Sequence, residues 1–228
     1  MTGVQTCSLP INIFTTIFTF IGTIVIAVIC YLLIIFLLID IIKFIFKKTG
    51  FNGKTRYYLS KLYGNGISVI IIVFFIISYG VWNAVNPIVT NYNINTYKNA
   101  GKINSLSIVM VADMHMGISV RENGIDKMVT NINKLNPDIV FFCGDLVDES
   151  TPTKLKVYAG TAFKKIKSKY GVYAVTGNHG YLSKNLQETI NYLTAANVHV
   201  LQDQTVKINN SFYVIGRNDI SNPRKIGR

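Results

Sequence analysis

Residues Ile139–Asp148 read IVFFCGDLVD, an apolar run that ends in a glycine and two aspartates. A continuous apolar run of this length is typical of a strand buried on both faces of a parallel sheet. Gly144, Asp145 and Asp148 follow where an open α/β sheet places its functional loops, beyond the carboxyl ends of its strands. The segment therefore predicts a buried strand that delivers carboxylates to a site at the edge of a sheet.

The same pattern occurs on both sides of this segment. Ser105–Ala112 is rich in Ile, Val and Leu and leads into Asp113 and His115. Val172–Val175 is a third short apolar run, and it leads into three residues of the same kind, Gly177, Asn178 and His179. Three successive strands thus end in side chains that can bind a metal ion, and the glycines leave room for close backbone approach.

Helices are predicted between these strands. Apolar residues recur at helical intervals over Glu122–Leu135, and a second helical stretch covers Leu155–Ser168. Strands that alternate with helices indicate an α/β fold with a parallel sheet. The carboxyl ends of parallel strands meet at one edge, so we expect the acidic, imidazole and amide side chains to lie together.

In this order, Asp113-x-His115, Gly144-Asp145-x-x-Asp148 and Gly177-Asn178-His179 resemble the first three signature blocks of the calcineurin-like metallophosphoesterases. The set is specific although each block alone is not, and it covers about half of the chain. The later segment Tyr213–Asp219 and two apolar runs near the N-terminus resemble the membrane-anchored bacterial branch of that superfamily. The resemblance implies a metallophosphoesterase α/β sandwich over residues 104–228, incomplete at its C-terminus.

The resemblance also implies a role for each site residue. Asp113 and His115 would bind one metal ion, Asp145 would bridge two, and Asn178 would bind the second. His179 would face the phosphate, where it can stabilise charge or protonate the leaving oxygen. Two divalent cations about 3.5–4 Å apart clamp the oxygens of an in-line displacement. Oxygen and imidazole ligands suit Mn, Fe or Zn.

Three residues would support this site without binding metal, namely Gly144, Gly177 and Asp148. The family pattern continues with a further His and a Gly-His-x-His block, but no His follows His199 in this sequence. We therefore expect a fragment that lacks its last His ligands and is inactive by itself. His199 lies in the alternating segment Val198–Leu201 and is interpreted as structural, and Gly180 stands where the family usually carries an acidic residue.

The first 90 residues hold most of the apolar excess of a chain that is 50% hydrophobic and only 15% charged. Ile11–Ile39 carries no charge and exceeds the roughly 20 residues that cross a bilayer, and Ile67–Val85 is a second apolar run. We expect a transmembrane helix with an interfacial extension over residues 12–48 and a second transmembrane helix over 66–86. The chain is thereby predicted to be a multi-pass protein of the cell membrane.

Basic residues set the predicted orientation. The segment 49–65 between the two runs carries Lys54, Arg56 and Lys61 and no acidic residue, which favours a cytoplasmic loop. Residues 87–103 form a polar tether, and the domain after it is expected on the extracytoplasmic side. Residues 1–11 resemble a translated sequencing-adaptor read, as does Ile226–Arg228, so we expect an artefact there; a natural polar N-terminus is the alternative.

The net charge of +12 is shared between the two halves of the chain. Before Gly101 the basic residues cluster beside the apolar runs, which favours contact with membrane lipid over nucleic acid. The leading interpretation is a hydrolase of phosphate esters, with lipid-linked or cell-wall phosphate as one substrate class. A non-catalytic domain that binds a phosphorylated ligand or partner is the alternative, and an exported nuclease or nucleotide phosphodiesterase would share the metal site.

Overall fold

The computed structural model describes residues 13–49, 53–64, 66–98, 100–117, 120–148, 151–182 and 186–221. The chain divides into two compact units, Met1–Ile88 and Val89–Arg228. The predicted adaptor segments at 1–11 and 226–228 lie outside the described residues.

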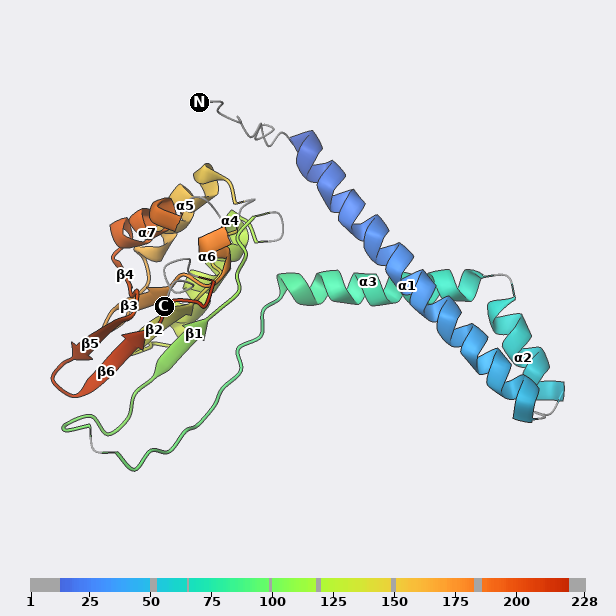
Figure 1. The fold of residues 1–228 in the computed structure, drawn as a ribbon, viewed down its shortest axis with the longest axis horizontal. Coiled ribbons are helices and arrows are strands. Elements are labelled where there is room, and N and C mark those ends of the chain that lie inside the picture. The colour runs from blue at the N-terminus through green and yellow to red at the C-terminus, as the bar shows by residue number, and fades with distance from the viewer. Residues whose placement is uncertain are drawn as a thin grey trace. The chain divides into compact units, whose positions relative to one another are not determined.

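The N-terminal unit is helical (Figure 1). It consists of α1 (Ile13–Thr49), α2 (Gly53–Tyr63) and α3 (Ile67–Val85), and α3 contacts both other helices. Two of its helical stretches, Ile17–Ile45 and Ile67–Val85, are long and apolar enough to cross a membrane. The segment predicted as a basic cytoplasmic loop at 49–65 contains α2, and its place relative to a membrane stays a prediction.

The C-terminal unit is a parallel sheet flanked by helices. Its strands are β1 (Ile108–Val111), β2 (Ile139–Cys143), β3 (Val172–Val175) and β4 (Val198–Val200), which pair in the order β1-β2-β3-β4. All three pairings are parallel. The prediction of an α/β fold with a parallel sheet is confirmed, and the strands that end in site residues are direct neighbours.

Helices cover one face of this sheet. These are α4 (Glu122–Lys134), α5 (Thr153–Phe163) and α7 (Leu186–Ala195), while the short α6 (His179–Leu182) follows β3. Val140 and Phe142 on β2 point into the core on this face, where they pack with Ile125 of α4 and Phe163 of α5. Alternate side chains of one strand point to opposite faces, so the intervening residues face the other way.

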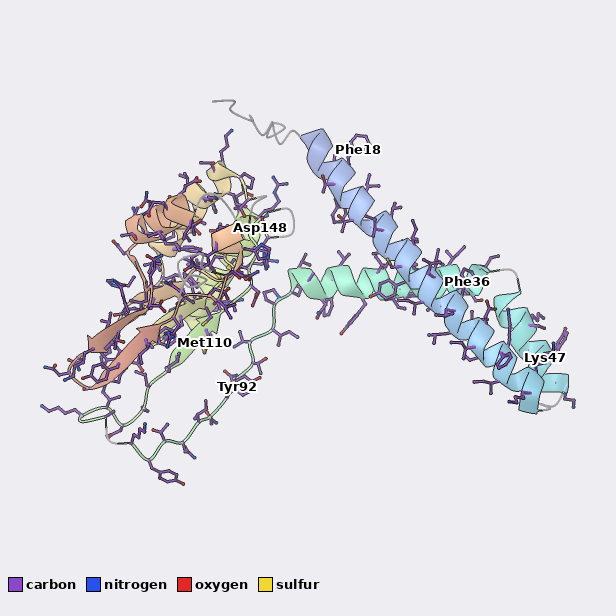
Figure 2. All side chains as sticks on the ribbon, in the orientation of Figure 1. Phe18, Phe36, Lys47, Tyr92, Met110 and Asp148 are labelled. Atoms are coloured by element: carbon purple, nitrogen blue, oxygen red, sulfur yellow. The ribbon has the colours of Figure 1, made fainter. Side chains whose placement is uncertain are left out.

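The opposite face packs on a hairpin of β5 (Gln204–Ile208) and β6 (Phe212–Gly216), which pair antiparallel (Figure 1). Ile139 and Tyr173 form a second core there with Ile208 and Val214. The cover stops short of β1, where Met110, labelled in Figure 2, is 68% exposed by its accessible surface.

Two predicted elements are longer than the observed ones. The strand predicted over Ser105–Ala112 spans only Ile108–Val111. The helix predicted to Ser168 ends at Phe163. The backbone after it forms hydrogen bonds with the side chain of Asn133 on α4 instead of continuing the helix. Asn133 Nδ2 donates to the Lys165 carbonyl at 2.9 Å, and Asn133 Oδ1 accepts from the Lys167 N–H at 2.7 Å.

Candidate metal centre

The loops that follow β1 and β2 are joined by backbone hydrogen bonds. The Asp113 N–H donates to the Gly144 carbonyl at 3.2 Å, and the His115 N–H donates to the Asp145 carbonyl at 3.0 Å. Met116 and Val147 continue this contact as a parallel bridge. The first and second motifs therefore lie side by side beyond the sheet, as expected for neighbouring parallel strands.

Three side chains from these loops and from the start of α6 meet at one point. The potential ligand atoms of His115, Asp145 and His179 lie within 4.8 Å of one another. The two imidazole rings meet edge to face, with centroids 4.8 Å apart and planes at 87°. A carboxylate with two imidazoles is a donor set that Mn, Fe and Zn accept, so the residues present fit a divalent transition metal.

Asp145 is the most buried member of this cluster. It is only 8% exposed, and its Oδ1 accepts a hydrogen bond from the His179 backbone N–H at 3.0 Å. Gly177 has φ +66°, and a Cβ there would lie 2.7 Å from Asp145 Cγ. Gly144 has φ +107°, and its Cβ would lie 3.0 Å from Gly177 Cα. Both positions therefore require glycine if the carboxylate is to keep its place.

Several site residues adopt a backbone conformation that non-glycine residues avoid. Asp113, His115 and Asp145 have φ values of 52°, 43° and 49°. Each left-handed residue costs about 1–2 kcal/mol, and such residues cluster at functional sites, where surrounding structure holds them. Here the inter-loop hydrogen bonds supply that constraint. Five further described residues outside the site also have positive φ, so the conformation alone does not mark the site: Asn136, Asn197, Asp203, Asn209 and Asn210.

The other predicted site residues lie at the margin of the cluster. Asp113 is exposed and is not among the three clustered residues of the described chain. Partial burial raises the pKa of the Cys143 thiol, and the negative charge of Asp113 raises it further. Asn178 is half-buried, and its carbonyl accepts from the Tyr181 N–H at 3.0 Å. The ligand roles of Asp113 and Asn178 stay predictions.

Two histidines differ in how they relate to the site. His179, predicted to face the phosphate, lies in the cluster with His115. His199 lies on β4 and is not one of the three clustered residues. Its ring stacks on that of Tyr173, with ring centroids 5.0 Å apart. This contact supports the structural interpretation of His199.

One polar residue beside the site, Thr151, was not predicted from the sequence. Thr151 is 5% exposed and its hydroxyl bonds to both strand-end loops, through the Met116 carbonyl and the Asp148 backbone N–H. A hydroxyl residue three positions after Asp148 was a signal for a local side-chain-to-backbone bond. Its contact with Met116, 35 residues away in the sequence, gave no such signal.

Comparison with known families places these residues in context. A sequence profile described as calcineurin-like phosphoesterase matches residues 106–226, which is more than half of the chain. All the predicted site residues fall inside the matched region.

Several proteins are similar over this region. A bovine (Bos taurus) transmembrane protein with metallophosphoesterase domain is 32% identical over 57% of this chain and 29% of its own length. An uncharacterised metallophosphoesterase of Campylobacter jejuni is 31% identical over 74% of this chain and 44% of its own. The UDP-2,3-diacylglucosamine pyrophosphatase LpxG of Chlamydia trachomatis is 29% identical over 58% of this chain and 41% of its own. The chain thus matches less than half the length of each of these relatives.

Proposed function

Because the chain belongs to the calcineurin-like phosphoesterase family, we propose that it is a membrane-anchored, metal-dependent hydrolase of phosphate esters that works by a two-metal mechanism. The observation that carries the proposal is the convergence of His115, Asp145 and His179 at the ends of neighbouring parallel strands. Asp145 is buried and its carboxylate lies within 4.8 Å of ligand atoms of both imidazoles, which supports its proposed role as the bridging carboxylate.

The residues divide into ligands and a group that handles the phosphate. We assign Asp113, His115, Asp145 and Asn178 as ligands of two divalent cations, with Mn, Fe or Zn as candidates. Bound cations would offset the charge on the phosphoryl oxygens and favour ionisation of a water molecule. His179 lies in the cluster, so its imidazole would be placed to donate a proton to the leaving oxygen of a phosphate ester bound there.

Asp145 also has a geometric role that does not depend on its charge alone. The His179 backbone N–H donates to its carboxylate at 3.0 Å, so the ligand and the proton donor are held by one hydrogen bond. Gly177 allows that approach because it lacks a Cβ. This hydrogen bond holds the His179 backbone beside the carboxylate, which would keep His179 next to a phosphate bound at the cluster.

A membrane-linked substrate class suits the rest of the chain. Two helices are long and apolar enough to span a bilayer, and the bovine relative is named a transmembrane protein. The basic segment around α2 favours a cytoplasmic loop, which would put the domain after residue 103 on the extracytoplasmic side. LpxG acts on a diacylated sugar nucleotide by its name. A phosphate ester linked to lipid or to the cell wall is therefore the substrate class we propose.

Hydrolysis of a mono-ester and a bis-ester model substrate with added Mn²⁺ tests this function. The protein is compared with its Asp145→Asn variant, and Asp126→Asn, which changes an exposed aspartate on α4, is the matched control. We expect Asp145→Asn to lower kcat by about 10³-fold, since metal stabilisation of the transition state is worth several kcal/mol.

Other outcomes have distinct meanings. Activity on the bis-ester alone would indicate a nuclease or nucleotide phosphodiesterase. A protein that is inert with every metal, yet retains a phosphorylated ligand, would replace the enzyme by a phosphate-binding domain. Full activity in Asp145→Asn would contradict the two-metal assignment.

A further inference from the structure

Helix α2 connects the two helices of the N-terminal unit that are long and apolar enough to cross a membrane. It contacts α3, and α3 contacts α1, so the chain turns back on itself at α2 (Figure 1). With α1 and α3 as membrane spans, the end of α1 and the start of α3 emerge at the same membrane surface, because the 11 residues of α2 are too few to cross a bilayer. Helix α2 then lies beside the lipid headgroups.

Basic residues gather at this end of the N-terminal unit. They are Lys43, Lys47, Lys48, Lys54, Arg56 and Lys61. All the lysines of this group have exposed side chains, and Figure 2 labels Lys47 near the end of α1. Lys43 lies 3.3 Å from Asp40, which is the only acidic residue in the sequence before Asp113. The N-terminal unit therefore has no further carboxylate to offset the other positive charges.

The opposite ends of α1 and α3 are uncharged. The sequence has no charged side chain over residues 1–39, or over residues 62–97, which include all of α3 and the segment that follows it. Near the end of α3, Tyr79 and Trp82 are exposed, with ring centroids 6.2 Å apart. Both ends thus carry aromatic side chains of the kind found at membrane interfaces, but only the end with α2 is basic.

The surface of α2 combines cations with aromatic rings. Lys54, Tyr57 and Lys61 are three and four residues apart, so they share one face of the helix. Tyr57 and Tyr58 are 62% and 70% exposed, and their ring centroids lie 5.8 Å apart. Tyrosine rings favour the headgroup layer, which is apolar on one side and wet on the other, and ammonium groups beside them can bind lipid phosphate.

We propose that α2 is an interfacial helix that binds the headgroups of anionic phospholipids, with its lysines on the lipid phosphates and its tyrosines among the headgroups. Charge complementarity favours this partner, because each basic residue close to an anionic leaflet strengthens the attraction about fivefold. The inference rests on the membrane anchor of the proposed function, since α2 continues from both helices of that anchor. It adds a lipid-binding surface formed by residues other than those of the metal centre.

The test compares two tryptophan reporters of the protein in mixed vesicles of phosphatidylcholine and phosphatidylglycerol. The sequence has a single tryptophan, Trp82, at the uncharged end of α3. Tyr58→Trp combined with Trp82→Phe moves the reporter to α2. Separate samples contain phosphatidylglycerol or phosphatidylcholine with a nitroxide quencher near the headgroup. The ratio of the two quenching constants measures the local preference for the anionic lipid.

We expect the α2 reporter to prefer phosphatidylglycerol about fivefold at low salt, the effect of one basic residue near the lipid. The Trp82 reporter should show no preference. Replacement of Lys54, Arg56 and Lys61 by glutamine should bring the ratio at α2 to within about twofold of unity, because little charge then remains on the helix. Salt at about 1 M should have the same effect without these replacements, since it screens charges beyond about 3 Å.

The matched control removes the same formal charge from the C-terminal unit. Its changes are Lys164→Gln, Lys165→Gln and Lys167→Gln, at exposed lysines that follow α5. Both ratios should stay at their parent values in this variant. The salt measurement needs no substitution beyond the reporter, so the result does not depend on the folding of the variant that lacks the basic residues of α2.

Equal quenching of the α2 reporter by the two lipids at low salt overturns the proposal and leaves the membrane anchor in place. A preference that persists both without the basic residues and at high salt also overturns it, because the preference would then not come from charge. If neither lipid quenches either reporter, the helices do not lie in the bilayer. The membrane anchor of the proposed function then fails together with this inference.

Discussion

Large apolar side chains are mostly exposed in the N-terminal unit and mostly buried in the C-terminal unit. On α1, Phe18 is 73% exposed and Leu33 is 65% exposed, and Figure 2 shows Phe18 and Phe36 projecting from the helix. In the C-terminal unit Phe142 and Phe163 are each 1% exposed, with ring centroids 5.0 Å apart. The C-terminal unit gains its stability from internal packing. Among the described residues of the N-terminal unit, the large apolar side chains of α1 are mostly exposed, which fits the proposed membrane anchor.

This difference implies that a substitution can impair the stability or membrane insertion of one unit without affecting the other. A core cavity should destabilise the C-terminal unit alone, and a charge on α1 should affect membrane insertion alone. Paired substitutions of the same kind, one in each unit, therefore test the comparison directly.

The largest effect is expected from Phe142→Ala. Its ring is buried against α5, so truncation leaves a cavity and should lower the free energy of unfolding of the C-terminal unit by about 3–5 kcal/mol. The matched change Phe18→Ala should leave that value unaltered. Chemical denaturation followed by a probe in the C-terminal unit measures both. Equal losses from the two changes would show that the units fold as one.

Insertion into the membrane should respond to Leu33→Lys. Leu33 lies well inside the apolar stretch Ile17–Ile45, where a lysine costs about 2.5–3.5 kcal/mol of insertion free energy. Val157→Lys is the counterpart on α5, where the side chain is 63% exposed in the C-terminal unit. A glycosylation-mapping assay of membrane integration should detect the first change and not the second. Normal integration of Leu33→Lys would contradict the membrane anchor.

The sequence predicted the sheet well because each strand is a short apolar run that ends in a polar loop. Ile139–Cys143 and Val172–Val175 are clear examples, and their parallel pairing placed Asp145 and His179 together. Helix α2 was not predicted, because a short basic segment between two apolar runs has no apolar period of its own.

The details of the site depend on contacts between distant segments, which a local pattern does not contain. Asp113 and His115 are two residues apart, yet of the described residues only His115 joins the cluster with Asp145 and His179. The spacing alone is compatible with either arrangement. Thr151 was missed for the same reason, since its partner Met116 belongs to another loop.

Glycine substitutions give a sharper contrast between the units. In Gly177→Ala the residue must keep φ +66° and its Cβ must displace the Asp145 carboxylate, so we expect a loss of about 1–2 kcal/mol in stability and weaker Mn²⁺ binding. Gly22→Ala on α1 places its Cβ in open space and removes a poor helix former. Calorimetric titration with Mn²⁺ distinguishes the two variants, because only Gly177→Ala should weaken binding. Undiminished binding in Gly177→Ala would show that Asp145 does not depend on this close approach.

The smallest effect concerns a charge inside the C-terminal unit. Lys156 on α5 has a side chain that is only 8% exposed, and its Nζ lies 3.2 Å from Oε2 of Glu188, which is 40% exposed. In α1, by contrast, the pair Asp40 and Lys43 is 3.3 Å apart and exposed on both sides. A buried charge needs its partner, whereas a solvated charge does not.

This asymmetry predicts that the two halves of the buried pair are not equivalent. Glu188→Gln leaves the buried ammonium with a neutral acceptor and should cost about 1 kcal/mol, the difference between a charged and a neutral hydrogen bond. Lys156→Met leaves a carboxylate that water can reach and fills the same space with an apolar chain, so its cost should stay within about 0.5 kcal/mol. Lys43→Met is the exposed counterpart and should not change the unfolding of the C-terminal unit. Chemical denaturation of the three variants gives the change in the free energy of unfolding for each. A greater loss of stability from Lys156→Met than from Glu188→Gln would mean that packing of the lysine stem, rather than burial of its charge, determines the contribution of this pair.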